Sequence, residues 1–238
     1  METPRPDPET AGRVFSSVRK VRLGDATPGR RVRLDALCSF LQDVAEDDAE
    51  DAGLSREVGW LVRKTVIEIE RFPVFGDEVQ LETFCTATGP SWAERTTLVR
   101  GPAGASLRAR SVWVAVEVET GRPVRLGEDF FGLYGSSAAG RRVSARLVLP
   151  GPPPGLLRQP WPTRASDYDV WGHLNNTTTF RLAEDAISSC PVEPRYAECE
   201  YARAVLPDDK TEVVREDGKP LRLWLLARGE VAASLLVS

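Results

Sequence analysis

The sequence predicts an α+β fold made of two similar repeats, each a long helix wrapped by an antiparallel sheet. A helical pattern occurs once in each half of the chain, and four strand patterns in succession follow each helix. The same order of elements returns after roughly 140 residues, which indicates an internal repeat. A lone amphipathic helix must bury its apolar side against the sheet that follows it. We therefore expect two helix-on-sheet repeats, joined edge to edge or back to back.

The first repeat is expected over residues 13–134. A strand at 14–23 precedes a helix that begins at Leu34, where apolar residues recur at helical spacing, and Gly53 supplies the stop. Acidic residues crowd the last turns of this helix, and we expect them to form a solvated outer face. Four strands separated by Gly-containing turns follow, at 60–71, 78–86, 92–100 and 106–118.

The second repeat is expected over residues 156–238. Residues 1–12 are rich in Pro and acidic residues and are expected to form a disordered tail, and the Pro/Gly/Arg-rich residues 135–155 form a linker. The elements expected in the second repeat are a strand at 159–164, a helix at 176–189, and strands at 196–205, 211–215, 221–227 and 231–237.

The composition excludes several classes of function. The chain has one histidine, His173, so a zinc site with two or three His ligands is excluded, and we expect no metal and no cofactor. A net charge of −4 argues against nonspecific nucleic-acid binding. The four cysteines form no C-x-x-C pair, which favours a reducing compartment, and no apolar run is long enough for a membrane span. We expect a cytoplasmic protein without a nucleic-acid or membrane partner.

Polar side chains that could take part in catalysis concentrate between Ser166 and Asn176, at the expected start of the second helix. A carboxylate and an imidazole there would supply a general base and a proton shuttle. Unpaired N–H groups at a helix N-terminus suit an oxyanion, and Gly172 lets the backbone approach a substrate closely. The alternatives are structural: Asn175 or Asn176 caps the helix, His173 fills a hydrogen-bonded niche, and Asp167 fixes the turn.

The run from Ser166 to Asn176 resembles the S-D-x-D-x-N-x-H-V-N-N signature of the fatty acyl-acyl-carrier-protein thioesterases of plants and bacteria. Phe72–Thr83, Ser111–Arg125 and the pair Glu200-Tyr201 are also similar to segments of that family, so the resemblance covers most of residues 14–237. It implies a tandem (double) hotdog fold. It also implies that the first repeat shapes the acyl cavity without catalysis and that the second carries the chemistry.

The resemblance assigns roles within the second repeat. Asp169 would be the catalytic carboxylate, acting as base or nucleophile, and His173 its imidazole partner. The backbone N–H groups of Gly172 and Leu174 are expected to hold the oxyanion. The first repeat has Asp25 in a comparable turn but no histidine, which implies that it is inert.

Two positions depart from the family pattern. Trp171 stands where the family has Asn, and Ala204-Val205 stand where it has a Glu-Cys pair. Trp171 is expected to wall off part of the thioester site, to stack on an unusual acyl group, or to pack in the core. Trp171, Asn175 and Asn176 are our candidate substrate-binding residues.

The resemblance implies hydrolysis of acyl thioesters on acyl carrier protein, or on coenzyme A, releasing a free carboxylic acid in fatty acid biosynthesis and lipid metabolism. The expected partner is an acyl carrier protein carrying an acyl-phosphopantetheine thioester, with Arg30, Arg31 and Arg33 as a candidate contact. The acyl tail is expected in the apolar interior beside the central helix. The chain would be a pseudo-dimer by itself, and further pairing into a homodimer is left open.

Two other functions remain open at this stage. Loss of the family's Asn and Glu is consistent with a degenerate site that binds or transfers an acyl group without hydrolysis. A hotdog hydratase or dehydratase also places Asp and His at a helix entrance. A Ser-His-Asp hydrolase is disfavoured because the sequence has no G-x-S-x-G elbow.

Overall fold

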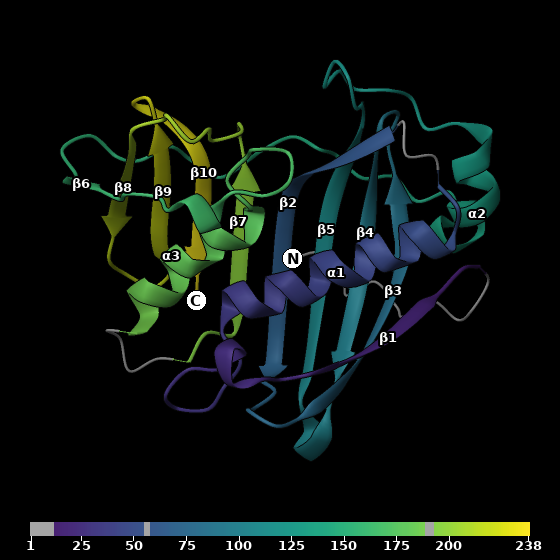
Figure 1. Cartoon of the computed structure of the whole chain (residues 1–238), viewed down its shortest axis with the longest axis horizontal. Coiled ribbons are helices and arrows are strands. Elements are labelled where there is room, and N and C mark those ends of the chain that lie inside the picture. The colour runs from purple at the N-terminus through teal and green to yellow at the C-terminus, as the bar shows by residue number, and fades with distance from the viewer. Residues whose placement is uncertain (1–11, 55–57, 189–192) are drawn as a thin grey trace.

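A computed structural model describes residues 12–54, 58–188 and 193–238 (Figure 1). In the first repeat a short edge strand leads through a turn into the long helix, and four strands follow it. These elements are β1 (Phe15–Lys20), α1 (Leu34–Asp51), β2 (Val58–Arg71), β3 (Glu78–Thr88), β4 (Trp92–Arg100) and β5 (Ser106–Glu117). The helix and strands predicted for this repeat are confirmed, and most of their predicted first and last residues lie within two residues of the observed ones.

The second repeat has the same order of elements. They are β6 (Arg158–Pro160), α3 (Asn176–Ser188), β7 (Tyr196–Tyr201), β8 (Thr211–Glu216), β9 (Leu221–Ala227) and β10 (Glu230–Val237). Two predicted strands, 159–164 and 196–205, are too long. After Tyr201 the N–H groups of Ala202 and Arg203 both turn to the Ala232 carbonyl, which ends the regular ladder of β7.

All these strands form one ten-stranded antiparallel sheet in the order β1-β3-β4-β5-β2-β7-β10-β9-β8-β6. Each repeat therefore runs from an outer edge strand to its own central strand, and β2 pairs with β7 at the junction, where Thr65 lies opposite Cys199. The two helices lie on the same face of the sheet and contact each other (Figure 1). This arrangement confirms the tandem hotdog fold and shows that the repeats join edge to edge.

The apolar side of α1 and that of α3 belong to one continuous core. Leu34, Leu37 and Val44 of α1 are fully buried, and the same cluster contains Phe180 of α3 and Ile67 of the central strand β2. Because both helices pack on a shared core, the start of α3 is fixed relative to the middle of α1.

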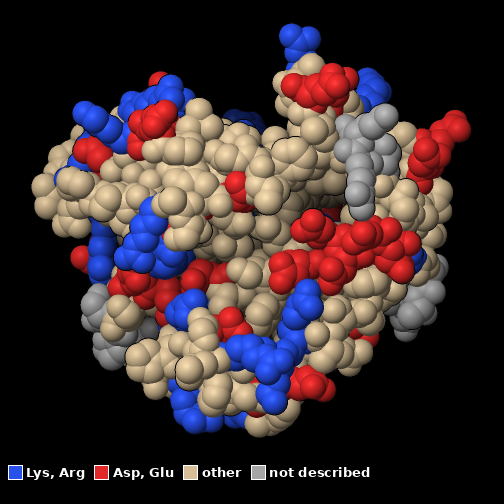
Figure 2. Space-filling model, in the orientation of Figure 1, with Lys and Arg blue, Asp and Glu red and all other residues tan. Residues whose placement is uncertain are grey.

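The acidic end of α1 is only partly solvated. Figure 2 shows acidic side chains gathered over this part of the helix, as expected. Asp48, however, is 0% exposed, and its carboxylate accepts hydrogen bonds from Arg13, Arg95 and the Tyr134 hydroxyl. Two arginines and a phenol compensate the cost of burying this charge.

A helix that the sequence did not predict, α2 (Glu128–Ala138), packs near β3, and it occupies the first residues assigned to the linker. The rest of the linker is held against the sheet. Glu200, 1% exposed, accepts the N–H groups of Val148 and Leu149 at 2.8 Å each, and the Trp224 indole donates to the Pro150 carbonyl. Since Cys199 faces the helices, Glu200 points to the opposite face, and the linker crosses that face.

Some predictions fall where the structure gives no description. The predicted disordered tail lies outside the described residues up to position 11, and so does Cys190. The described cysteines, Cys38, Cys85 and Cys199, are free and buried. None of the helices in the described ranges is long and apolar enough to cross a membrane.

Candidate functional site

The predicted catalytic residues lie in a tight turn between a 3-10 turn (Ala165–Asp167) and α3. The Asp169 Oδ1 atom accepts the N–H groups of Trp171, at 2.9 Å, and His173, at 3.2 Å. The Asp169 N–H in turn donates to the His173 carbonyl at 2.9 Å. These bonds hold Asp169 and His173 beside one another, both half-buried.

The tip of the turn points to solvent. Gly172 has a φ of 73°, a conformation that favours glycine, and no atom lies within 4 Å of where its Cβ would be. Val170 is 95% exposed and Trp171 63% exposed, so the expectation that Trp171 packs in the core is wrong. Trp171 does not line the pocket described below.

The two N–H groups expected to bind the oxyanion are both used by the fold. The Leu174 N–H donates to the Val205 carbonyl at 2.9 Å, and the Gly172 N–H donates to the Asp169 carbonyl at 3.0 Å. In this arrangement neither group is available to a substrate, so the expected oxyanion site at Gly172 and Leu174 is wrong. Among the described residues, the N–H of Asn176, the first residue of α3, has no hydrogen-bond partner.

The two asparagines have different roles. Asn175 caps α3, because its Oδ1 accepts both the N–H and the hydroxyl of Thr177 at 2.9 Å. Asn176 instead lines a small pocket between α1 and the start of α3, and its carbonyl accepts the Tyr201 hydroxyl at 3.1 Å. The capping alternative therefore holds for Asn175.

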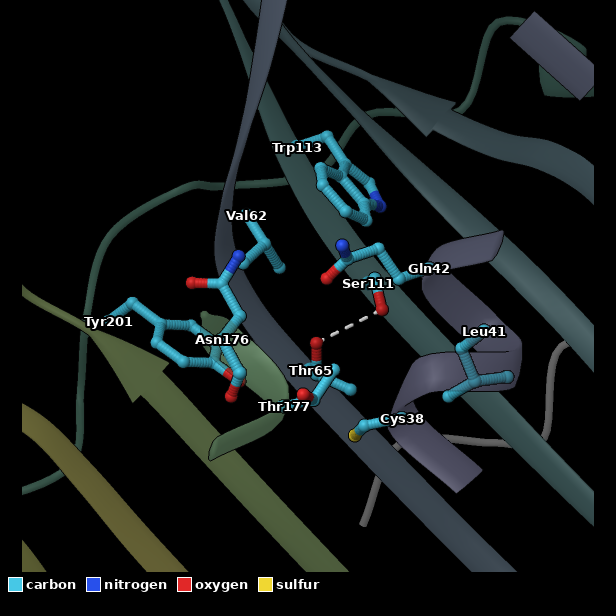
Figure 3. Close-up of a pocket in the computed structure, with 10 residues that line it drawn as sticks. All are labelled: Cys38, Leu41, Gln42, Val62, Thr65, Ser111, Trp113, Asn176, Thr177 and Tyr201. Carbon is cyan, nitrogen blue, oxygen red and sulfur yellow. Dashed lines mark hydrogen bonds between the residues drawn. The ribbon is translucent and has the colours of Figure 1, made fainter. Parts of the chain in front are cut away.

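The pocket encloses about 20 Å³, enough for roughly one water molecule. It lies over the junction strand β2 and its neighbours, and α1 contributes Gln42 (Figure 3). The other residues that line it are Cys38, Leu41, Val62, Thr65, Ser111, Trp113, Asn176, Thr177 and Tyr201.

Sequence reasoning missed Gln42. The available signal was a polar residue beside Leu41, on the side of α1 that carries Cys38 and Leu41 into the interior. Asn176, which also lines the pocket, belongs to the other repeat. The pocket is thus formed only where the two repeats meet.

The turn before α3 has a counterpart before α1, and the same main-chain bonds define it. The Thr27 N–H donates to the Arg31 carbonyl, and the Arg30 N–H donates to the Thr27 carbonyl. Arg30 has a φ of 72°, close to that of Gly172. Thr27 therefore stands where the second repeat has Asp169, and Arg31 stands where it has His173.

The 3-10 turns match as well. Asp25 accepts the N–H of Arg22, and Asp167 accepts the N–H of Arg164, in the same way. Asp25 is therefore the counterpart of Asp167 and not of Asp169. Burial acts to raise the pKa of Asp167, but hydrogen bonds from Arg181 and the Arg164 N–H outweigh it and hold the pKa below its usual value.

At the start of α1 the equivalent space is filled by a carboxylate. Glu184 of α3 accepts the Leu34 N–H at 3.0 Å, and its two oxygens accept the Arg31 guanidinium at 2.7 and 3.0 Å. Leu34 is the counterpart of Asn176. One helix N-terminus thus carries an anion from within the protein, as its dipole favours, while the other faces the pocket.

The arginines expected to contact an acidic carrier are engaged within the chain. Arg31 pairs with Glu184 and lies over the Phe72 ring, and Arg33 pairs with Asp35. Arg30 lies over the Phe75 ring. At the other departure from the family pattern, Ala204 is exposed, and Val205 is buried with its carbonyl bound to Leu174.

Comparison with solved structures identifies the architecture. The structure is similar to a 12:0-ACP thioesterase from Umbellularia californica, with a TM-score of 0.77 and 21% identity over 94% of this chain and 96% of that one. It is also similar to a putative oleoyl thioesterase from Lactobacillus plantarum, with a TM-score of 0.79 and 18% identity over 95% of each chain. At these identities the likeness establishes the fold.

Comparison of sequences identifies the family. An uncharacterized protein of Mycobacterium tuberculosis is 26% identical over 96% of this chain and 93% of its own length. A dodecanoyl-[acyl-carrier-protein] hydrolase of Cinnamomum camphora is 25% identical over 69% of this chain, but the match spans only 48% of the plant protein. Residues 12–134, more than half of the sequence, match the model of a protein family that is described as the N-terminal domain of acyl-ACP thioesterase. The chain belongs to the acyl-ACP thioesterase family.

Proposed function

We propose that this protein hydrolyses acyl thioesters carried by acyl carrier protein, or by coenzyme A, at the start of α3. The proposal rests on a difference between the N-termini of α1 and α3. Glu184 fills the first one, whereas the second opens on a pocket beside a turn that holds an aspartate and the single histidine. Membership of the family supports thioester hydrolysis as the reaction.

The proposed roles follow from the geometry of the turn. Asp169 takes a proton from a water molecule as the water oxygen bonds to the thioester carbon. The carbonyl oxygen becomes an oxyanion, which the Asn176 N–H stabilises at the positive end of α3. When the C–S bond breaks, the sulfur leaves with the bonding electrons and takes a proton from His173. The proton that Asp169 took from water then passes to His173, which restores both groups. The products are a carboxylic acid and a thiol.

A nucleophilic route uses the same residues. Asp169 would attack the thioester carbon directly, and water would then hydrolyse the resulting anhydride. Both routes release the same acid and thiol. The proposed setting is the cytoplasm, on carrier-bound acyl groups of fatty acid biosynthesis, with the acyl carrier protein as the partner.

The test is the release of thiol and free acid from acyl-carrier and acyl-coenzyme A thioesters, followed by colorimetry and mass spectrometry. We expect both products from the native protein and a loss of at least about 10²-fold in kcat for Asp169→Ala. Unchanged turnover in that variant would overturn the assignment. A stable acyl-carrier complex without free acid would instead indicate a binding protein, and a mass gain of one water without thiol release would indicate a hydratase.

A further inference from the structure

The floor of the pocket is polar, where an apolar interior was expected. Side chains of β2 and β5 on the face that carries the helices include apolar core residues, such as Ile67 and Leu107. At the level of the pocket they change to Thr65 and Ser111, which are 5% and 8% exposed. Their hydroxyl oxygens lie 3.1 Å apart on adjacent strands (Figure 3).

One of the two hydroxyl hydrogens in this pair lacks an acceptor among the residues that the structure describes. Each hydroxyl has one hydrogen and can accept two hydrogen bonds. When one donates to the other, the second hydrogen still needs an acceptor, and within the described residues neither hydroxyl has any further hydrogen-bond partner. Because a buried donor without an acceptor costs free energy, an acceptor placed in the pocket would be favoured.

A second unsatisfied donor lies on the same wall. Trp113 follows Ser111 by two residues on β5, so both side chains face α1. Its indole nitrogen is buried and has no hydrogen-bond partner in the described part of the chain. Both residues line the pocket. The residues that carry these two donors therefore line a space that a substrate would enter from the start of α3.

In the described part of the chain, the region beyond the pocket carries polar and charged side chains. Under the second half of α1, the Thr83 and Thr97 hydroxyls lie 3.0 Å apart, and the Arg95 guanidinium reaches the buried Asp48. Each methylene of a long acyl chain gains about 0.8 kcal/mol when it is buried among apolar groups. Polar and charged side chains already occupy this interior, so a long chain would not make that gain here.

We infer that the protein selects short acyl groups that carry an oxygen acceptor close to the thioester, with that oxygen in the one-water pocket, and a 3-oxoacyl group is the best fit. A ketone oxygen has two lone pairs and can accept both a hydroxyl and an indole N–H. This inference rests on the proposed hydrolysis at the start of α3 and specifies its substrate class.

The test compares four thioesters on one carrier: acetoacetyl, 3-hydroxybutyryl, butyryl and dodecanoyl. We expect kcat/KM to be highest for acetoacetyl and lowest for dodecanoyl. The ratio of acetoacetyl to butyryl should fall about tenfold in Thr65→Val combined with Ser111→Ala, and also in Trp113→Phe, because each change removes donors. The double variant stays close to the native shape, whereas Trp113→Phe also removes one ring of the indole. Using the ratio cancels the intrinsic reactivity of the 3-oxo thioester.

The matched control is Thr97→Val, which removes an equally buried hydroxyl that does not line the pocket. It should leave the ratio unchanged. A preference for dodecanoyl, or the same ratio in the pocket variants and the native protein, would overturn the inference and leave the proposed hydrolysis intact. Absence of thiol release from every thioester would overturn the proposed function itself.

Discussion

Arg31 and Glu184 form an ion pair with two hydrogen bonds across the interface between the repeats, and Glu184 also accepts the Leu34 N–H. Arg31 precedes α1, and Glu184 lies in α3. The pair therefore joins the two repeats and occupies the helix N-terminus of the first. In the second repeat the counterparts of Arg31 and Leu34 are His173 and Asn176, and within the described residues the Asn176 N–H has no hydrogen-bond partner.

Removing Arg31 should destabilise the protein strongly. In Arg31→Met the Glu184 carboxylate, in a residue 5% exposed, loses its cation. Breaking a buried pair in this way costs about 3–5 kcal/mol, and methionine retains part of the contact with Phe72. Urea unfolding at pH 7 measures the change.

An exposed pair provides the comparison. Arg222 and Glu216 are 37% and 32% exposed, so Arg222→Met should cost less than about 1 kcal/mol. Adding Glu184→Gln to Arg31→Met should recover part of the loss, because the amide still accepts the Leu34 N–H without a charge. Equal costs for the two arginine variants would contradict the account of this pair.

The Asn176 N–H can be removed without removing the helix. Asn176 is the first residue of α3, a position that tolerates proline, and proline has no N–H. Asn176→Pro should lose about 10²–10³-fold in kcat, whereas Asn176→Ala, which keeps the N–H, should lose far less. Thiol-release kinetics with thermal melts as the folding check compare them. An equal loss in both variants would mean that this N–H does not stabilise the oxyanion.

Lowering the pH should reduce the free energy of unfolding, because Asp167 becomes protonated. Its folded pKa is lowered, so its carboxylate contributes stability above the unfolded value of about 3.9, and this contribution is lost as the pH falls through the lower folded value. Asp167→Asn should therefore be less stable than the native protein at pH 7 and closer to it at pH 3. Urea unfolding at both pH values tests this, and a constant difference would count against the Asp167–Arg181 pair as the cause.

Trp171 should contribute little to stability. Its side chain is 63% exposed, and substitutions at exposed positions usually change the free energy of unfolding by less than about 0.5 kcal/mol. The midpoint of urea unfolding should therefore be nearly the same for Trp171→Ala and for the native protein. A loss of about 3 kcal/mol or more, typical of a buried tryptophan, would show that it packs in the core.

Most helices and strands, and the internal repeat, could be predicted from the sequence because each produces a periodic pattern of apolar residues over a short stretch of chain. The helix that begins at Leu34 and the strand with its alternation around Trp113 are two such patterns. The helix α2 was missed because Gly132 and Gly135 lower its helix propensity, although Phe130, Tyr134 and Ala138 recur at helical spacing and are buried.

The site could be predicted only in part. Asp169 and His173 are close in sequence, so their proximity follows from the turn itself. The use of the Leu174 N–H depends on Val205, which lies on a distant segment, and the presence of Gln42 and Asn176 around one pocket depends on how the repeats join. Such long-range relationships leave no local pattern, because they depend on the packing of segments far apart in the chain.

The matched positions Asp169 and Thr27 test most directly whether the second repeat alone carries out hydrolysis. Thiol release from an acyl-carrier thioester should be measured for Asp169→Ala and Thr27→Ala, with both variants shown to be folded. We expect Asp169→Ala to lose at least about 10²-fold in kcat and Thr27→Ala to stay close to the native rate. Equal rates in the two variants would contradict the assignment of the chemistry to the start of α3.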